Sequence, residues 1–240
     1  MFYRNIKKTL AKIRHTPLHP QWIVYRNEHQ YHSQIGEQVT GTVLDIGCAD
    51  QHIKKYIQNS NYIGLDYYQT ATHWYGTQPD VYGDAQTLPF ADNSMDTVLL
   101  LDVLEHLPHP KDCISEIARV LKPTGLLVLQ VPFIYPIHDA PLDFQRWTQY
   151  GLEQLVSKYG FTTRQKITIG KPLETAGLLL NIAISKTILN WLRKKNPALI
   201  LGILAPMAIL SINFFCWLFS FLSPMDEMMP HSYRLILEKQ

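Results

Sequence analysis

The chain has 240 residues, of which 46% are hydrophobic and 18% charged, and its formal net charge at pH 7 is +2. This length suits one large domain, or one domain with an appendage. The nearly neutral total gives no indication of a nucleic-acid partner, and we expect none. Three cysteines without metal-like spacing, Cys48, Cys113 and Cys216, and the lack of a secretory signal predict free thiols in a reducing cytosol.

The N-terminal region, residues 1–40, begins with a basic segment. Residues 2–14 read FYRNIKKTLAKIR, with apolar side chains at helical spacing and lysines and arginines between them. This pattern predicts a short basic amphipathic helix. Two interpretations stay open, a solvated helix packed on the domain and a helix that lies on a membrane surface.

Strand-like and helix-like segments alternate from residue 41 onward. Strands are predicted over residues 41–48, 61–67, 81–85, 95–103, 125–132 and 161–170, and helices over 50–58, 111–122 and 147–160. Strands with few charges, separated by helices, indicate a parallel sheet that is covered on both faces. We therefore predict a doubly wound α/β fold with its ligand at the carboxyl ends of the strands.

The loop after the first predicted strand indicates the type of ligand. Residues 43–55 read VLDIGCADQHIKK, so the loop holds one glycine, Gly47, with Ala49 and Gln51 where a dinucleotide loop has further glycines. We expect Asp50 to cap the following helix, where its carboxylate would repel a phosphate. Asp45 and Asp50 instead suit a cationic ligand such as S-adenosylmethionine, whose sulfonium and ammonium groups are both positive.

The stretch from residue 41 to 132 resembles the class I S-adenosylmethionine-dependent methyltransferases of the methyltransferase type 11 group, and more loosely the resemblance reaches residue 170. It is carried by VLDIGCAD, YIGLDY, VYGDAQTLPF, VLLLDVLEHL and EIARVLKPTGLLVLQVP. The resemblance implies a Rossmann-like sheet with seven strands and an antiparallel last strand. It divides the chain into a core over residues 41–170, an apolar helical insert over 171–225 and a closing strand within 226–240.

The resemblance also implies the donor site, with S-adenosyl-L-methionine as cofactor and S-adenosyl-L-homocysteine as product. Asp66, 21 residues after Asp45, takes the position that binds the ribose hydroxyls, and Asp84 the position that binds the adenine amino group. The full set of implied donor-binding residues is Asp45, Gly47, Cys48, Ala49, Asp66, Tyr67, Asp84, Ala85, Leu101 and Asp102. Taken singly, Asp66 and Asp84 are also compatible with ordinary turns at strand ends.

Candidate catalytic residues lie in the long loop over residues 132–148. We expect His138 or Asp143 to deprotonate or orient the acceptor, and Arg146 to pair with an acidic group on it. The alternative is a structural ion pair between Asp143 and Arg146 that fixes the loop. His106 is expected to shape its loop, and the sequence predicts no metal site.

Residues 198–222 form an uncharged apolar stretch that is long enough to cross a bilayer, and residues 173–192 before it are also apolar. We consider three arrangements for these segments. They are a single membrane span, a helix pair that dips into one leaflet, and a helix pair buried in the domain or in a homodimer. The second is favoured, which places the protein in the cytoplasm, peripheral or monotopic at the inner face of the cell membrane.

These features predict a methyltransferase that acts on a small-molecule, lipid or lipid-linked sugar acceptor. One alternative is a non-catalytic protein that binds S-adenosylmethionine or assists assembly. Another is a nucleotide-dependent oxidoreductase or epimerase, which the single glycine and Asp50 disfavour.

Overall fold

The computed structural model describes residues 11–58 and 60–240, so the helix predicted over residues 2–14 lies for the most part outside the described residues. The chain forms two compact units. One unit comprises residues 1–30 and 170–231, and the other, here called the core unit, comprises residues 31–169 and 232–240. Each unit is described separately below.

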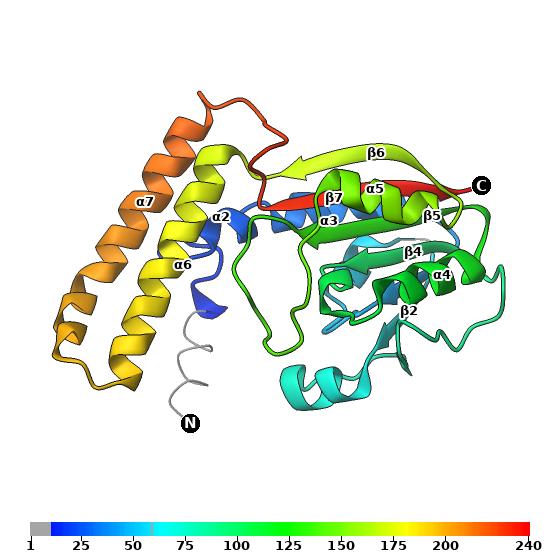
Figure 1. The fold of residues 1–240 in the computed structure, drawn as a ribbon, viewed down its shortest axis with the longest axis horizontal. Helices are drawn as coiled ribbons and strands as arrows, with labels where there is room; N and C mark the ends of the chain where they lie inside the picture. The colour runs from blue at the N-terminus through cyan, green and yellow to red at the C-terminus, as the bar shows by residue number, and fades with distance from the viewer. Residues whose placement is uncertain (1–10, 59) are drawn as a thin grey trace. The chain divides into compact units, whose positions relative to one another are not determined.

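The core unit contains a seven-stranded sheet in the order β3-β2-β1-β4-β5-β7-β6 (Figure 1). The strands are β1 (Thr42–Ile46), β2 (Asn61–Asp66), β3 (Val81–Tyr82), β4 (Met95–Leu101), β5 (Leu121–Pro132), β6 (Phe161–Ile169) and β7 (Ser232–Lys239). The first five strands run parallel, whereas β7 lies antiparallel between β5 and β6. The predicted Rossmann-like α/β fold with an antiparallel last strand is therefore confirmed.

Side chains alternate between the two faces of the central strands. Leu44 and Leu100 belong to one buried cluster, and their neighbours Val43 and Leu99 belong to the other. The first cluster is covered by α4 (Pro110–Val120) and α5 (Gln149–Ser157), and the second packs against residues of and after α3 (Glu28–Gly36). Because both faces are covered, the strands are uniformly apolar, as expected for a parallel sheet.

The prediction of a helix over residues 50–58 capped by Asp50 is wrong. The segment forms a short 3-10 helix, η1 (His52–Tyr56), whose N-cap residue is Gln51 and whose amides receive no side-chain cap. Ala49 and Gln51 have left-handed backbone conformations, with φ of 45° and 57°, so the chain turns before a capping geometry is reached. The Asp50 carboxylate instead lies 2.6 Å from Nε2 of His52.

Two further short elements follow strands of the core, the π-helix η2 (Thr70–Tyr75) after β2 and the 3-10 helix η3 (Leu104–His106) after β4. Each begins within four residues of the carboxyl end of its strand. They bring their polar side chains to the edge of the sheet where a ligand of a parallel sheet is expected.

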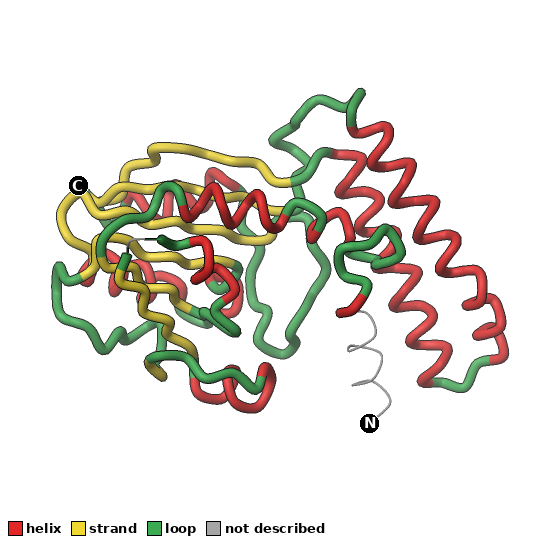
Figure 2. Tube along the Cα trace, turned by 180° about the vertical axis from the view of Figure 1, so that it is seen from behind, coloured by secondary structure: helices red, strands yellow, loops and turns green. Residues whose placement is uncertain are grey.

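The second unit contains a helical hairpin. It is built from α6 (Pro172–Arg193), η4 (Pro197–Leu204) and α7 (Ala205–Ser220), which run side by side (Figures 1 and 2). Ile169 at the end of β6 is paired with Ser232 at the start of β7. The chain therefore leaves the sheet at Ile169 and rejoins it next to the same residue. A single membrane span would put β7 on the opposite side of the membrane from its sheet, so that interpretation is wrong.

Polar contacts at a buried asparagine fix the hairpin to the N-terminal residues of the same unit, which include α2 (Trp22–Tyr25). Asn213 is fully buried in α7, and its Nδ2 donates to the carbonyl oxygens of Pro17 and His19 at 2.7 and 3.0 Å. Its Oδ1 accepts a hydrogen bond of 2.8 Å from Nδ2 of Asn181 in α6. These bonds satisfy polar groups that burial would otherwise leave unpaired.

Acidification is expected to destabilise this unit. Burial lowers the pKa of both His19 and His231 to about 4, whereas an unfolded histidine has a pKa of about 6.5. Below pH 6.5 the unfolded chain therefore binds more protons than the folded chain. The free energy of unfolding has its full value above that pH and decreases towards pH 4. The decrease is up to about 1.4 kcal/mol per pH unit for each histidine. Urea unfolding at pH 7 and 4.5 measures this loss.

The variant His19→Gln removes one of the two titrating groups and should make the pH dependence less steep. The exposed His73 provides the control, because His73→Gln should leave the slope unchanged. An equal slope in wild type and His19→Gln would contradict the assignment.

Candidate functional site

Asp66 connects the ends of β1 and β2 at the predicted donor site. Its side chain is buried, and it accepts hydrogen bonds from the amides of Ala49 at 2.9 Å and Tyr67 at 2.7 Å. The hydroxyl of Thr70 in η2 donates to it as well, at 3.0 Å. The carboxylate therefore lies directly beside the loop that follows β1, where the predicted ribose-binding residue belongs.

The loop after β1 adopts a tight turn with a single glycine. Gly47 has a φ of 72°, and a Cβ added there would lie 2.4 Å from Cγ2 of Val103, so the position favours glycine. The amides of Gly47 and Cys48 donate to the carbonyl oxygen of Leu65 at 2.8 and 3.1 Å. The left-handed Ala49 and Gln51 complete a turn that the missing glycines do not prevent.

Asp45 lies inside the sheet. Its carboxylate accepts a hydrogen bond of 2.5 Å from the Tyr62 hydroxyl on β2, and burial raises the pKa of Asp45 to about 7. Its charge near neutral pH therefore depends on what else occupies the site.

Asp84 closes a turn after β3. Its Oδ1 accepts from the amide of Gln86 at 2.8 Å and from the Gln86 side chain at 3.2 Å, while Ala85 is buried. The turn-forming role that the sequence left open for Asp84 is thus present. Contact of this residue with adenine stays a prediction.

The end of β4 is linked to two other strands. Asp102 follows Leu101 with a φ of 55°, and its Oδ2 accepts a hydrogen bond of 2.7 Å from Nε2 of Gln130 on β5. The buried Arg234 on β7 in turn donates to Oε1 of Gln130 at 2.7 Å. Asp102 is therefore connected through Gln130 to β5 and β7.

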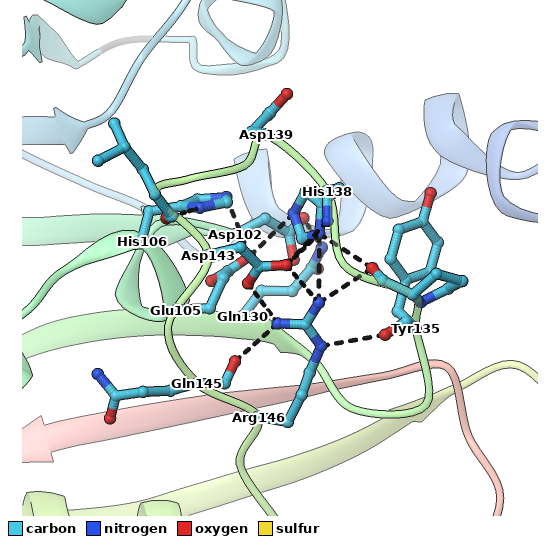
Figure 3. Close-up of polar contacts among 12 residues, drawn as sticks. Asp102, Glu105, His106, Gln130, Tyr135, His138, Asp139, Asp143, Gln145 and Arg146 are labelled. Carbon is cyan, nitrogen blue, oxygen red and sulfur yellow. Dashed lines mark hydrogen bonds and ion pairs between the residues drawn. The ribbon is translucent and has the colours of Figure 1, made fainter.

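Arg146 holds the loop after β5 together (Figure 3). Its guanidinium makes two bonds to the Asp143 carboxylate, at 2.5 and 2.7 Å. It also donates to three backbone carbonyl oxygens, those of Tyr135, Pro136 and Gln145. The structural ion pair that the sequence left open is therefore formed, and it occupies the group predicted to bind an acidic acceptor.

Asp143 is poorly suited to act as a base. Its hydrogen bonds with Arg146 lower the pKa of Asp143 to about 2, and its side chain is 1% exposed. A carboxylate with such a low pKa accepts a proton weakly at neutral pH. Its other contact is with His138, whose amide donates to Asp143 Oδ2 at 2.8 Å.

The structure also places Glu105 in this region, a residue that no sequence pattern singled out. Glu105 is fully buried in η3, and its Oε1 lies 3.6 Å from Nε2 of His106 and 3.6 Å from Nε2 of His138 (Figure 3). The only sequence signal was its place directly before His106. Nδ1 of His106 lies 2.7 Å from the carbonyl oxygen of Leu142, which joins η3 to the loop after β5.

Comparison with known proteins identifies the core. Residues 44–129 match the family model described as a methyltransferase domain. A protein of Mycolicibacterium smegmatis named as a probable S-adenosylmethionine-dependent methyltransferase is 30% identical over 50% of each chain. The crystal structure of the PH0226 protein from Pyrococcus horikoshii OT3 has the same fold, with a TM-score of 0.51 at 17% identity over 95% of this chain and 96% of that chain.

Two further relatives have acceptors in their names. A fatty-acid O-methyltransferase of Mycolicibacterium smegmatis is 26% identical over 70% of this chain and 65% of its own length. The sterol 24-C-methyltransferase ERG6A of Gibberella zeae is 34% identical over 55% of this chain and 38% of its own length. The chain thus spans between 38% and 65% of the length of these three relatives.

The matched segment covers β1 to β5 almost completely, and it contains Asp45, the Gly47 loop, Asp66, Asp84 and Asp102. The family uses S-adenosyl-L-methionine as its methyl donor. Residues 44–129 are therefore a methyltransferase domain of the class I S-adenosylmethionine-dependent family.

Proposed function

We propose that this protein transfers a methyl group from S-adenosyl-L-methionine to an amphiphilic acceptor, a lipid or lipid-linked molecule, at the surface of a membrane. The observation that carries this proposal is the apolar surface of the hairpin inserted between β6 and β7. The fatty-acid and sterol methyltransferases among the relatives are consistent with it, since their names describe apolar acceptors.

The hairpin exposes many large apolar side chains. Pro172–Arg193 and Pro197–Ser220 are both long and apolar enough to cross a membrane, by length and composition. Within α7 only Ile209, Asn213 and Ser220 are buried. Ile203 is 80% exposed and Leu222 81% exposed, and large contiguous apolar patches of this kind mark contact with a partner or with lipid.

The charges at the tip of the hairpin favour a position in one leaflet. Arg193, Lys194 and Lys195 follow each other where α6 ends, and all three are exposed. At the centre of a bilayer each would cost about 3 kcal/mol, and cationic loops stay on the cytoplasmic side. We therefore infer that the hairpin lies along the inner leaflet, with its tip among the lipid head groups.

The chemistry requires little beyond alignment. The acceptor atom bonds to the methyl carbon as the carbon–sulfur bond breaks, and the sulfur keeps the electron pair, giving S-adenosyl-L-homocysteine. An acceptor hydroxyl also releases its proton to a base or to water. Asp66, Asp84 and the Gly47 loop would bind the donor, and the loop fixed by Asp143 and Arg146 would orient the acceptor.

Incubation of the protein with methyl-labelled S-adenosylmethionine and total lipid in vesicles tests the proposal. We expect the label to enter an organic-soluble product, and vesicles floated on a density gradient to carry the protein. Ile203→Asp should abolish flotation, because it places a charge in the apolar surface of η4. Tyr150→Asp is the control, since Tyr150 is 70% exposed in the core unit and should leave flotation unchanged.

Label found only in water-soluble products, together with a protein that stays out of the vesicle fraction, would contradict the proposal. If that protein were also dimeric, the apolar surface would be a subunit interface. Binding of S-adenosyl-L-homocysteine without turnover on any extract would instead favour a donor-binding protein that has no catalytic activity.

A further inference from the structure

We propose that Glu105, His106 and His138 form a binding site for a divalent first-row transition-metal ion. Their ligand atoms all lie within 4.8 Å of one another, on η3 and on the loop after β5 (Figure 3). Two imidazole nitrogens and one carboxylate oxygen are the donor set that such ions prefer, and three protein ligands leave coordination positions open.

The buried carboxylate is the first argument for a cation. Glu105 is fully buried, and neither of its oxygen atoms has a hydrogen-bond partner. An isolated buried carboxylate is costly, so such groups are paired or bind a metal ion. Oε1 of Glu105 lies at ion-pair distance from Nε2 of His106 and Nε2 of His138. Both separations are 3.6 Å, longer than the distance of about 2.8 Å of a charge-assisted hydrogen bond.

The hydrogen bonds of His106 point its lone pair at Glu105. Nδ1 of His106 lies 2.7 Å from the carbonyl oxygen of Leu142, which can only accept, so Nδ1 carries the hydrogen. In the neutral ring Nε2 is then unprotonated, and it is the nitrogen that faces Oε1 of Glu105. A carbonyl that fixes the tautomer of a ligating histidine in this way is usual around protein metal sites.

His138 is oriented in the same way by a carboxylate. Its Nδ1 lies 3.3 Å from Oδ2 of Asp143 and 3.4 Å from the carbonyl oxygen of Pro136. Nη2 of Arg146 is 3.4 Å from this nitrogen, but it already donates to Asp143 and Pro136. Nδ1 of His138 is therefore the donor, so in the neutral ring Nε2 is unprotonated and can bind an ion. Without an ion, the interaction with Glu105 raises the pKa of His138.

The distances from Glu105 to the two histidines suit ligands of one ion. Ligand atoms about 2.0–2.2 Å from a metal ion lie about 3–3.6 Å from each other at the angles of tetrahedral or octahedral coordination. Both nitrogen–oxygen distances, at 3.6 Å, are close to this range. The two histidine nitrogens lie within 4.8 Å of each other, so they would draw closer on binding an ion. The mixed nitrogen and oxygen set favours Zn²⁺, Mn²⁺ or Co²⁺ over Mg²⁺, which prefers oxygen ligands alone.

An ion at this place would have a role in the proposed reaction, and this part of the inference rests on the proposed function. Its open positions would accept an oxygen of the methyl acceptor, and coordination lowers the pKa of a bound hydroxyl. Metal binding itself does not depend on that role and can be measured without turnover.

Titration of tag-free, chelator-treated protein with Zn²⁺, Mn²⁺ or Co²⁺ by calorimetry tests the site, with metal content measured after dialysis. We expect about one ion per chain, a Co²⁺ absorption spectrum typical of nitrogen and oxygen ligands, and no comparable response to Mg²⁺. Glu105→Gln and His138→Gln should weaken binding by more than about 100-fold. Asp143→Asn, which leaves the ligands in place, should weaken it about 10- to 100-fold.

His109→Gln is the matched control, because His109 is an exposed histidine near η3 and outside the cluster. Circular dichroism and thermal unfolding of each variant separate loss of the ligand from loss of the fold. Absence of binding in the wild type, or equal binding in folded Glu105→Gln and His138→Gln, would overturn the proposal. Methyl transfer is measured in the same preparations without added metal. Transfer without metal binding would overturn the metal site and leave the proposed function intact.

Discussion

Replacement of Asp66 by alanine is expected to weaken the binding of S-adenosyl-L-homocysteine by at least about 100-fold. A carboxylate that binds both ribose hydroxyls makes two charged hydrogen bonds, each of which contributes about 1.5–3 kcal/mol. Their loss therefore exceeds the roughly 2.7 kcal/mol that corresponds to two orders of magnitude in affinity. Calorimetric titration of wild type and Asp66→Ala gives the measurement.

The control for this experiment is Asp50→Asn. Asp50 lies on the adjacent loop but is about half exposed and pairs with His52, so its loss should change affinity little, by less than about threefold. Asp66 also holds Ala49 and Tyr67 in place, so the fold of each variant must be checked by thermal unfolding. A folded Asp66→Ala protein with wild-type affinity would show that the ligand lies elsewhere.

Replacement of Asn213 by alanine is expected to destabilise the unit that contains the hairpin by about 3–5 kcal/mol. The substitution removes the partner of the buried carbonyl oxygen of His19 and of the buried amide of Asn181, and of the partly buried carbonyl oxygen of Pro17. Each buried polar group left unpaired costs about 1–3 kcal/mol. Hydrogen exchange followed by mass spectrometry should show lost protection in residues 11–26 and in α7.

Asn190 offers a matched asparagine on the same hairpin. It is exposed on α6, so Asn190→Ala should change stability by less than about 0.5 kcal/mol. If Asn213→Ala kept full protection in residues 11–26, the buried bonds would not be what fixes the N-terminal residues to the hairpin.

The parallel sheet could be predicted from the sequence because its apolar runs are separated by helices, a pattern that few folds share. The donor site was predicted from three acids, Asp45, Asp66 and Asp84. The structure places Asp45 within β1, Asp66 at the end of β2 and Asp84 two residues after β3, and their contact with the donor stays a prediction. The helix over residues 50–58 was wrong because left-handed Ala49 and Gln51 shorten it, and neither residue type signals that conformation.

The loop after β5 shows what a sequence cannot supply. Asp143 and Arg146 stand three residues apart, and the same spacing allows a reactive pair or a structural one. Only the structure shows that backbone carbonyl oxygens occupy the remaining hydrogens of Arg146. Glu105 and His138 are 33 residues apart in the chain, and no local pattern predicts that they meet.

The position of β7 between β5 and β6 has a consequence for biosynthesis. Because β6 is attached to the sheet only through β7, it stays unpaired until β7 has left the ribosome. The apolar hairpin is made between these two strands, so it emerges while the sheet is still open. A nascent chain at this stage exposes an apolar hairpin and an unpaired strand, both of which favour association with a lipid surface or a chaperone.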